Sequence, residues 1–287
     1  MNIWQKIIID KSNKIKKFNL FNRQNYYPEI IDRKSSDWAK FCKINEHYNS
    51  KEAFLNKYLI NRFKTWDNYL LNNITKDNKC LSIGSGRAVN ELALIDKNFN
   101  ITCSDLAIPE TYVNSKNIFS EFKYIQFDVI KDKIDQKFDT VFSLHTFYLF
   151  SENELQIAFE NINNILNKDG TFIVDMNTED NFFSYFYHNI YLFIESYFIY
   201  FLSKLLKKNI GILIDKNFGY KYKKKEILNI AKEKNFQILD IHSDGLNEIE
   251  RSFFLKKLIK RFPFFKRILG KFFKSIPYHN IYKFKKI

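Results

Sequence analysis

A glycine turn between an apolar strand and a helix constrains this chain more than any other feature. The segment 80–88 reads Cys-Leu-Ser-Ile-Gly-Ser-Gly-Arg-Ala and holds two of the seven glycines, Gly84 and Gly86. Glycine lets the backbone approach a ligand closely, and such a turn aims the N-terminus of the next helix at that ligand. Residues 101–105 then read as a strand ending in the carboxylate of Asp105, which could hydrogen-bond ribose hydroxyls. This order predicts a nucleotide-binding α/β fold.

Strands and helices alternate from residue 79 onward. We expect strands at 79–84, 100–105, 122–127, 138–144, 171–176 and 236–241, helices at 88–96, 108–118, 151–167 and 225–234, and one more strand at the C-terminus. Crossovers of this length predict a parallel sheet covered on both faces. We expect an N-terminal helical extension or lid over 1–75, then one domain over 76–287 with insertions at about 180–215 and 246–276.

The ordered motifs resemble those of the class I S-adenosylmethionine-dependent methyltransferases, over about residues 55–241. The glycine turn resembles the loop that wraps the methionine end of the cofactor, and Asp105 resembles the acid that holds the ribose. The segment Phe127-Asp128-Val129 resembles the motif that contacts the adenine. Residues 138–145 resemble the fourth-strand motif, whose end faces the substrate.

The resemblance implies a Rossmann-like sheet of seven mostly parallel strands with an antiparallel last strand, and S-adenosyl-L-methionine as cofactor. The implied cofactor-binding residues are Ser82, Gly84, Ser85, Gly86, Asp105, Leu106, Asp128, Val129 and Leu144. Two positions depart from the family, which often has an acid where Ser82 stands and a third glycine where Ala88 stands. We therefore expect an altered loop.

His145 follows the fourth strand, at the sheet edge where open α/β folds bind ligands. A neutral imidazole there could take a proton from a hydroxyl acceptor, so His145 is the candidate catalytic residue; the alternative is a structural histidine. The three cysteines show no metal-ligand spacing, and we expect no metal site. The N-terminus lacks the apolar run of a signal peptide, and a cytoplasmic protein is expected.

Basic charge is concentrated at the C-terminus. Residues 251–287 hold 12 lysines and arginines and no acid, so the rest of the chain carries 34 basic against 32 acidic side chains. Around Pro263, two helical stretches each carry an apolar stripe: Phe254, Leu255, Leu258, Ile259 and Phe262, then Ile268, Leu269, Phe272, Phe273 and Ile276. This pattern is typical of an interfacial helix pair on an anionic membrane surface, and the alternative is a pair docked on the domain.

Residues 182–206 form an aromatic run whose only charges are Glu195 and Lys204. Its length suits a transmembrane helix, but its tyrosines and its acid favour a helical insertion that packs or faces a membrane. The function we expect is methyl transfer, to oxygen, on a small or lipid- or glycan-associated acceptor. Two alternatives stay open: an RNA-directed methyltransferase, and a catalytically silent methyltransferase-fold module that binds a membrane or a partner.

Overall fold

A computed structural model describes residues 50–58, 64–178, 180, 182–205, 220–243, 249, 252–275 and 279–287. Of the expected N-terminal extension or lid over 1–75, residues 1–49 and 59–63 lie outside these ranges, as does Ile276. The described residues divide into two compact units: a sheet unit of residues 50–175, 228–241 and 281–287, and a helical unit of residues 176–227 and 242–280.

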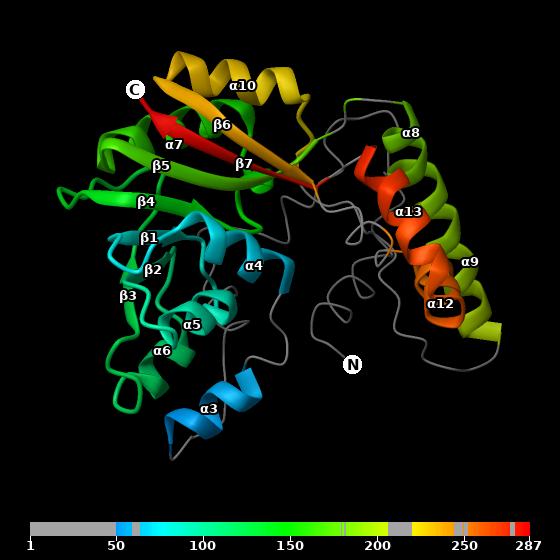
Figure 1. The fold of residues 1–287 in the computed structure, drawn as a ribbon, viewed down its shortest axis with the longest axis horizontal. Coiled ribbons are helices and arrows are strands. Elements are labelled where there is room, and N and C mark those ends of the chain that lie inside the picture. The colour runs from blue at the N-terminus through cyan, green and yellow to red at the C-terminus, as the bar shows by residue number, and fades with distance from the viewer. Residues whose placement is uncertain are drawn as a thin grey trace. The chain divides into compact units, whose positions relative to one another are not determined.

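The sheet unit is built on seven strands in the order β3-β2-β1-β4-β5-β7-β6. Their bounds are β1 Cys80–Ile83, β2 Ile101–Asp105, β3 Lys123–Gln126, β4 Phe138–Ser143, β5 Leu166–Asn177, β6 Phe236–Ser243 and β7 His279–Lys286. Strands β1 to β5 pair in parallel, and Figure 1 shows β7 running opposite to β6. The predicted Rossmann-like sheet with an antiparallel last strand is confirmed.

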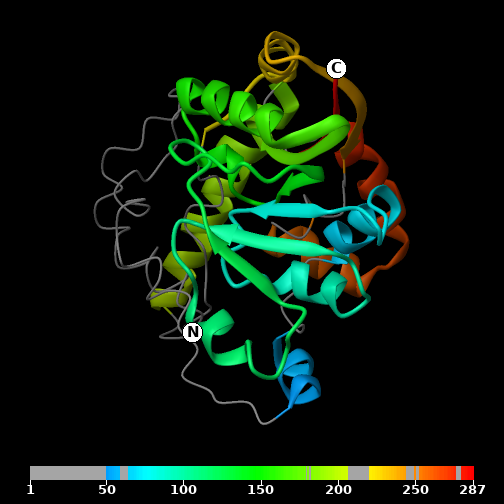
Figure 2. The ribbon, with the colours of Figure 1, turned by 90° about the vertical axis from the view of Figure 1, so that its left-hand side faces the viewer.

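Six helices and one short turn accompany this sheet. They are α3 Lys51–Tyr58, α4 Lys64–Asn73, α5 Val89–Ile95, α6 Glu110–Ser115, η3 Phe147–Leu149, α7 Glu152–Ile165 and α10 Lys224–Glu233. Figures 1 and 2 show α4 and α5 on one side of the sheet and α7 and α10 on the other. Both faces are therefore covered, as the alternating sequence predicted.

Each face of the sheet has its own apolar core because successive strand residues point to opposite sides. Phe142 of β4 and Ile173 of β5 belong to the cluster that includes α4 and α5. The neighbouring Phe172 points the other way, and its ring centroid lies 5.1 Å from that of Phe159 on α7. Phe284 of β7 joins the same aromatic group, 5.6 Å from Phe159. The sheet is thus buried on both sides, which a parallel sheet requires.

The fifth strand begins earlier than predicted. We expected helix to residue 167, a glycine stop at Gly170 and a strand from 171, but α7 ends at Ile165 and β5 begins at Leu166. The register of β4 against β5 shifts between Phe138 and Thr140, so the residues before Gly170 form an irregular strand entry. Side chains bind this entry to β4, because Asn167 Nδ2 donates to Asp139 Oδ1 at 2.7 Å.

The helical unit contains α8 Phe182–Tyr185, a π-helical turn Phe186–Tyr191, α9 Leu192–Leu205, α12 Phe253–Arg261 and α13 Phe264–Ser275. The predicted break between two basic helices occurs at Pro263. Among the described helices, none combines the length and the hydropathy that crossing a bilayer requires. Buried Tyr187, Leu192, Ile249 and Phe273 form the core of this unit.

Candidate functional site

The glycine turn lies at the carboxyl end of β1, and its backbone needs glycine. Gly84 has φ +71° and Gly86 has φ +53°, in the left-handed region that side chains disfavour. A Cβ atom on Gly84 would lie 2.1 Å from Thr146 Oγ1, on the segment after β4. The Thr146 hydroxyl also donates to the carbonyl oxygen of Gly84 at 3.3 Å. Glycine therefore lets the loops after β1 and β4 meet.

Ala88 keeps the backbone of the glycine that the family often has there. It adopts φ 55° and ψ 35°, just before α5, and it is fully buried. The left-handed conformation costs a non-glycine residue about 1 kcal/mol. The loop thus retains its shape at this departure, with some strain.

Asp105, the acid expected at the end of β2, holds the glycine turn. Its Oδ2 accepts a hydrogen bond from the Gly86 backbone N–H at 2.8 Å, and its Oδ1 accepts one from the Leu106 N–H at 2.7 Å. A carboxylate has about four acceptor sites, so these bonds are compatible with contact to a ribose. The spacing of Gly86 and Asp105 in the sequence thus reflects a direct contact.

A buried carboxylate that the sequence analysis did not single out lies beneath the turn. Glu91, in the first turn of α5, accepts a hydrogen bond from the Ser82 hydroxyl at 2.6 Å, and both residues are buried. An acid at this end of a helix is favoured by the helix dipole. Where the family often has an acid at the position of Ser82, this chain has a hydroxyl bonded to an acid nine residues later. The sequence signal that could have identified Glu91 is its position as an acid in the first turn of the helix predicted at 88–96.

Further bonds fix the turn on β2 and β3. The Ser85 backbone N–H donates to the Ser104 carbonyl at 2.8 Å, and the Ser104 N–H donates to Ser85 Oγ at 3.2 Å. From β3, the Tyr124 hydroxyl donates to the Gly86 carbonyl at 2.9 Å. Tyr124 was another residue that the sequence pattern did not single out. The loop is therefore held from two neighbouring strands.

Asp128 and Val129 follow β3 and form a local turn. The Asp128 Oδ1 accepts from the Ile130 N–H at 2.9 Å, and Lys131 Nζ lies 3.6 Å from its Oδ2. Val129 is buried, and its carbonyl accepts from Asn161 of α7 at 2.8 Å. These contacts give Asp128 a structural role; its contact with adenine stays a prediction.

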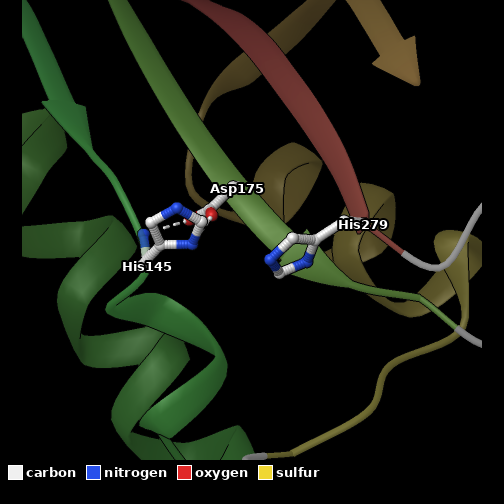
Figure 3. Close-up of side chains that lie close together, drawn as sticks. All are labelled: His145, Asp175 and His279. Atoms are coloured by element: carbon white, nitrogen blue, oxygen red, sulfur yellow. Dashed lines mark hydrogen bonds and ion pairs between the residues drawn. The ribbon is translucent and has the colours of Figure 1, made fainter. Parts of the chain in front are cut away.

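His145 lies two residues beyond β4, after buried Leu144, and it has φ 59°. Asp175 of β5, which is fully buried, binds it twice: Oδ1 accepts from the His145 backbone N–H at 2.7 Å, and Oδ2 lies 3.0 Å from Nδ1. Figure 3 shows the carboxylate beside the imidazole ring. A histidine in this disfavoured conformation, held by a buried acid, is typical of a functional site.

Strand register brings these residues to one edge of the sheet. Ile83, the last residue of β1, pairs with Ser104 of β2 and with Ser143 of β4. The Ser143 hydroxyl donates to the Ile83 carbonyl at 2.8 Å. The turn after β1, Asp105 and His145 therefore all follow the carboxyl ends of adjacent parallel strands. Ligands of open α/β sheets bind at such an edge, where the strand order reverses.

Three other polar residues have different placements. Tyr148 is buried on η3, with its ring centroid 6.4 Å from that of His145. Asn177 belongs to the helical unit, where its carbonyl accepts from the Tyr222 N–H at 3.1 Å. His279, also drawn in Figure 3, is the first residue of β7 and is assigned to the helical unit.

Comparison with known proteins agrees with this geometry. Residues 80–174 match the methyltransferase domain family. Among curated proteins, none matches the chain. The fold is similar to that of the PH0226 protein from Pyrococcus horikoshii OT3, with a TM-score of 0.50 and 15% identity, over 91% of this chain and 96% of that chain.

Two other solved structures are similar at slightly lower scores. Magnesium protoporphyrin IX methyltransferase from Synechocystis PCC 6803, with S-adenosylhomocysteine bound, has a TM-score of 0.49 and 11% identity, over 88% of this chain and 94% of that chain. An S-adenosylmethionine-dependent methyltransferase from Clostridium acetobutylicum ATCC 824 has a TM-score of 0.48 and 17% identity, over 82% and 98%. The domain match and the strand order lead to the same conclusion: residues 80–174 match a methyltransferase domain, and the sheet has the Rossmann-like order of the class I S-adenosylmethionine-dependent methyltransferase fold.

Proposed function

We propose that this methyltransferase transfers the methyl group of S-adenosylmethionine to a hydroxyl oxygen of a small acceptor. The observation that carries the proposal is the double contact between His145 and Asp175 at the carboxyl edge of the sheet. Methyl transfer to a nitrogen or sulfur lone pair needs no such base, whereas a hydroxyl must lose its proton as it reacts.

The residues for the cofactor fit its chemistry. When bound, S-adenosylmethionine supplies a methyl group already activated by its sulfonium sulfur. Gly84 and Gly86 have positive φ, and Gly84 has no room for a side chain beside Thr146, so the turn stays narrow at the end of β1. Asp105 provides a carboxylate for ribose hydroxyls, and Leu106 follows it. We assign the cofactor to the turn after β1 and the end of β2.

His145 acts on the acceptor. Nδ1 lies 3.0 Å from the Asp175 carboxylate, so we assign Nε2 as the ring nitrogen that meets the acceptor. Nε2 would accept the proton of the acceptor hydroxyl as its oxygen takes up the methyl group that bound S-adenosylmethionine would supply. The Asp175 carboxylate stabilises the imidazolium that results, and its bond to the His145 backbone fixes the ring's position.

The test is a comparison of three variants. His145→Ala should lower kcat about 10²–10⁴-fold, and Asp175→Asn should lower it by a smaller factor, because the base is lost in one and misoriented in the other. Tyr148→Phe is the matched control and should keep near-normal turnover. Calorimetry with S-adenosylhomocysteine should give unchanged affinity for all three. If His145→Ala loses cofactor affinity and thermal stability together while turnover per folded molecule is retained, His145 is structural.

We further propose that the acceptor is carried on a lipid or glycan and that the protein works peripherally at a membrane inside the cell. The support is the exposed basic surface of the helix pair α12 and α13, which includes Lys256, Lys257, Lys266, Arg267 and Lys271. Positive charge of this density favours an anionic partner. Turnover on a lipid-linked hydroxyl acceptor compared with the same headgroup in free form tests this assignment; equal rates would contradict it.

A further inference from the structure

The apolar face of helix α13 has a buried part and an exposed part. Its inner face packs in the helical unit, where Phe273 is 4% exposed and its ring centroid lies 4.6 Å from that of Tyr187. Leu269, one turn earlier, packs against the same cluster. The predicted apolar stripe is therefore only partly covered: Leu269 and Phe273 contact that core, whereas Ile268 and Phe272 are exposed. Its last member, Ile276, lies outside the described residues.

The outer face exposes three large apolar side chains. Phe264 is 62%, Ile268 58% and Phe272 50% exposed. Residues four apart lie above one another on a helix, so these three form one stripe along α13. We call them the outer stripe. A continuous apolar stripe in water is unfavourable, and such stripes mark sites of association.

The charged side chains of α13 itself are all basic. Lys266, Arg267, Lys271 and Lys274 are exposed on α13, and the sequence from 251 onward contains no acid. In the same unit, Glu195 is buried and bonded to the start of α12. Nothing among these described contacts neutralises the basic border.

We infer that the outer stripe of α13 inserts into the interface of an anionic lipid membrane, with the basic side chains at the headgroups. The combination selects this partner. A second copy of the chain would bring like charges together around the stripe, and a nucleic acid would offer no apolar surface to Ile268. An anionic bilayer matches both the basic side chains and the apolar stripe. Its headgroups attract lysine and arginine, and its acyl boundary accepts phenylalanine and isoleucine.

The biological role of this membrane binding rests on the proposed lipid- or glycan-linked acceptor, but vesicle binding can be measured separately from catalysis. The protein should co-sediment with vesicles of equal parts phosphatidylcholine and phosphatidylglycerol, and much less with phosphatidylcholine alone. Raising the salt well above about 0.1 M should weaken binding without abolishing it, because salt screens the charges and not the apolar insertion.

Adjacent residues provide matched variants. Ile268→Ser with Phe272→Ser should lower vesicle partitioning by about tenfold or more while leaving the melting temperature and S-adenosylhomocysteine affinity unchanged. Phe264→Ser alone should lower it by a smaller factor. Ile157→Ser with Val113→Ser removes two comparably exposed side chains of the sheet unit, 43% and 50% exposed, and should leave partitioning unchanged.

Each outcome decides the matter. Normal partitioning of the Ile268 and Phe272 double variant overturns the inference. It is also overturned if the wild type is a dimer that does not bind vesicles and the double variant is a monomer. Loss of binding on Arg267→Gln with Lys271→Gln, but not on the serine variants, would show charge attraction without insertion and would also overturn it. His145→Ala protein should bind vesicles like wild type, so a failure of the proposed chemistry is distinguishable from a failure of membrane binding.

Discussion

At the scale of single residues, carboxylates organise both ends of the sheet unit by accepting backbone N–H groups. Asp105 binds the amides of Gly86 and Leu106 at the carboxyl edge. Asp139, at the start of β4, accepts from the Lys79 N–H at 2.8 Å and from Asn167. Hydrogen bonds to a charged acceptor are worth about 1.5–3 kcal/mol each, so both acids stabilise the fold. Of these two acids, we expect Asp105 and not Asp139 to contact the cofactor.

These two acids give a matched pair of variants. Asp105→Ala should weaken S-adenosylhomocysteine binding by about 1–3 kcal/mol, because it removes the ribose contact and loosens the turn at Gly86. Asp139→Ala should lower the melting temperature and leave the affinity of the folded protein close to normal. Calorimetry at a temperature where both variants are folded makes the comparison. Equal losses of affinity would contradict a ribose-binding role for Asp105.

At the scale of secondary-structure elements, Glu195 of α9 anchors the basic helix pair. Its carboxylate accepts from the Ser252 hydroxyl at 2.7 Å and from the backbone N–H groups of Phe253 and Phe254 at 3.2 and 2.9 Å. Ser252 in turn caps α12 by accepting from the Leu255 N–H at 3.0 Å. A buried acid at the N-terminus of a helix accepts hydrogen bonds from backbone N–H groups that have no partner within the helix, and its charge interacts favourably with the helix dipole. The single acid of the aromatic run therefore has a structural role in the helical unit.

Removing this anchor should destabilise the helical unit. Glu195→Gln should cost about 1–3 kcal/mol, because the amide loses charge-assisted bonds to Ser252 and to two backbone N–H groups. Ser252→Ala should cost less, and the double variant should cost less than the sum, since the two side chains share one bond. Denaturant unfolding followed by circular dichroism measures all three. Additive effects would show that the residues act separately.

At the scale of the whole molecule, burial in the sheet unit governs the chemistry of the cysteines. Cys80 of β1 and Cys103 of β2 are both fully buried in the core on the α4 and α5 side. Burial raises the pKa of the Cys80 thiol to about 12, with the Asp139 charge adding to the effect. The pKa of Cys103 is also raised, by burial first and then by the charge of Glu91. Both thiols are therefore neutral apolar groups in the native protein.

The raised pKa makes stability depend on alkaline pH. Below the unfolded-state thiol pKa, about 9, both states hold the proton and the contribution of Cys80 is fully present. Between about 9 and 12 the unfolded thiol ionises while the folded one does not, so stability is lost as pH rises. Relative to Cys80→Ala, the wild type should lose about 1.4 kcal/mol between pH 8 and pH 10. Denaturant titrations at both values measure this, and parallel changes in the two proteins would contradict it.

Local pattern in the sequence determined the order of the elements. Alternating strands and helices, with crossovers too long for hairpins, allow few arrangements other than a parallel sheet covered on both sides. The glycine turn and Asp105 were found for the same reason, since a glycine turn after a strand and an acid at a strand end can be recognised from residue type and position. The start of β5 was missed because Asn167 joins β4 through Asp139, a contact 28 residues away.

Only the tertiary structure decided which side chains face one another. The pairing of Ser82 with Glu91, of His145 with Asp175, and of Glu195 with Ser252 each joins separate elements, and no periodicity encodes such a partner. The same holds for α13, where neighbouring Phe272 and Phe273 are alike in sequence yet 50% and 4% exposed. The physical reason is that a helical pattern specifies an apolar face, whereas burial depends on whether another element covers it.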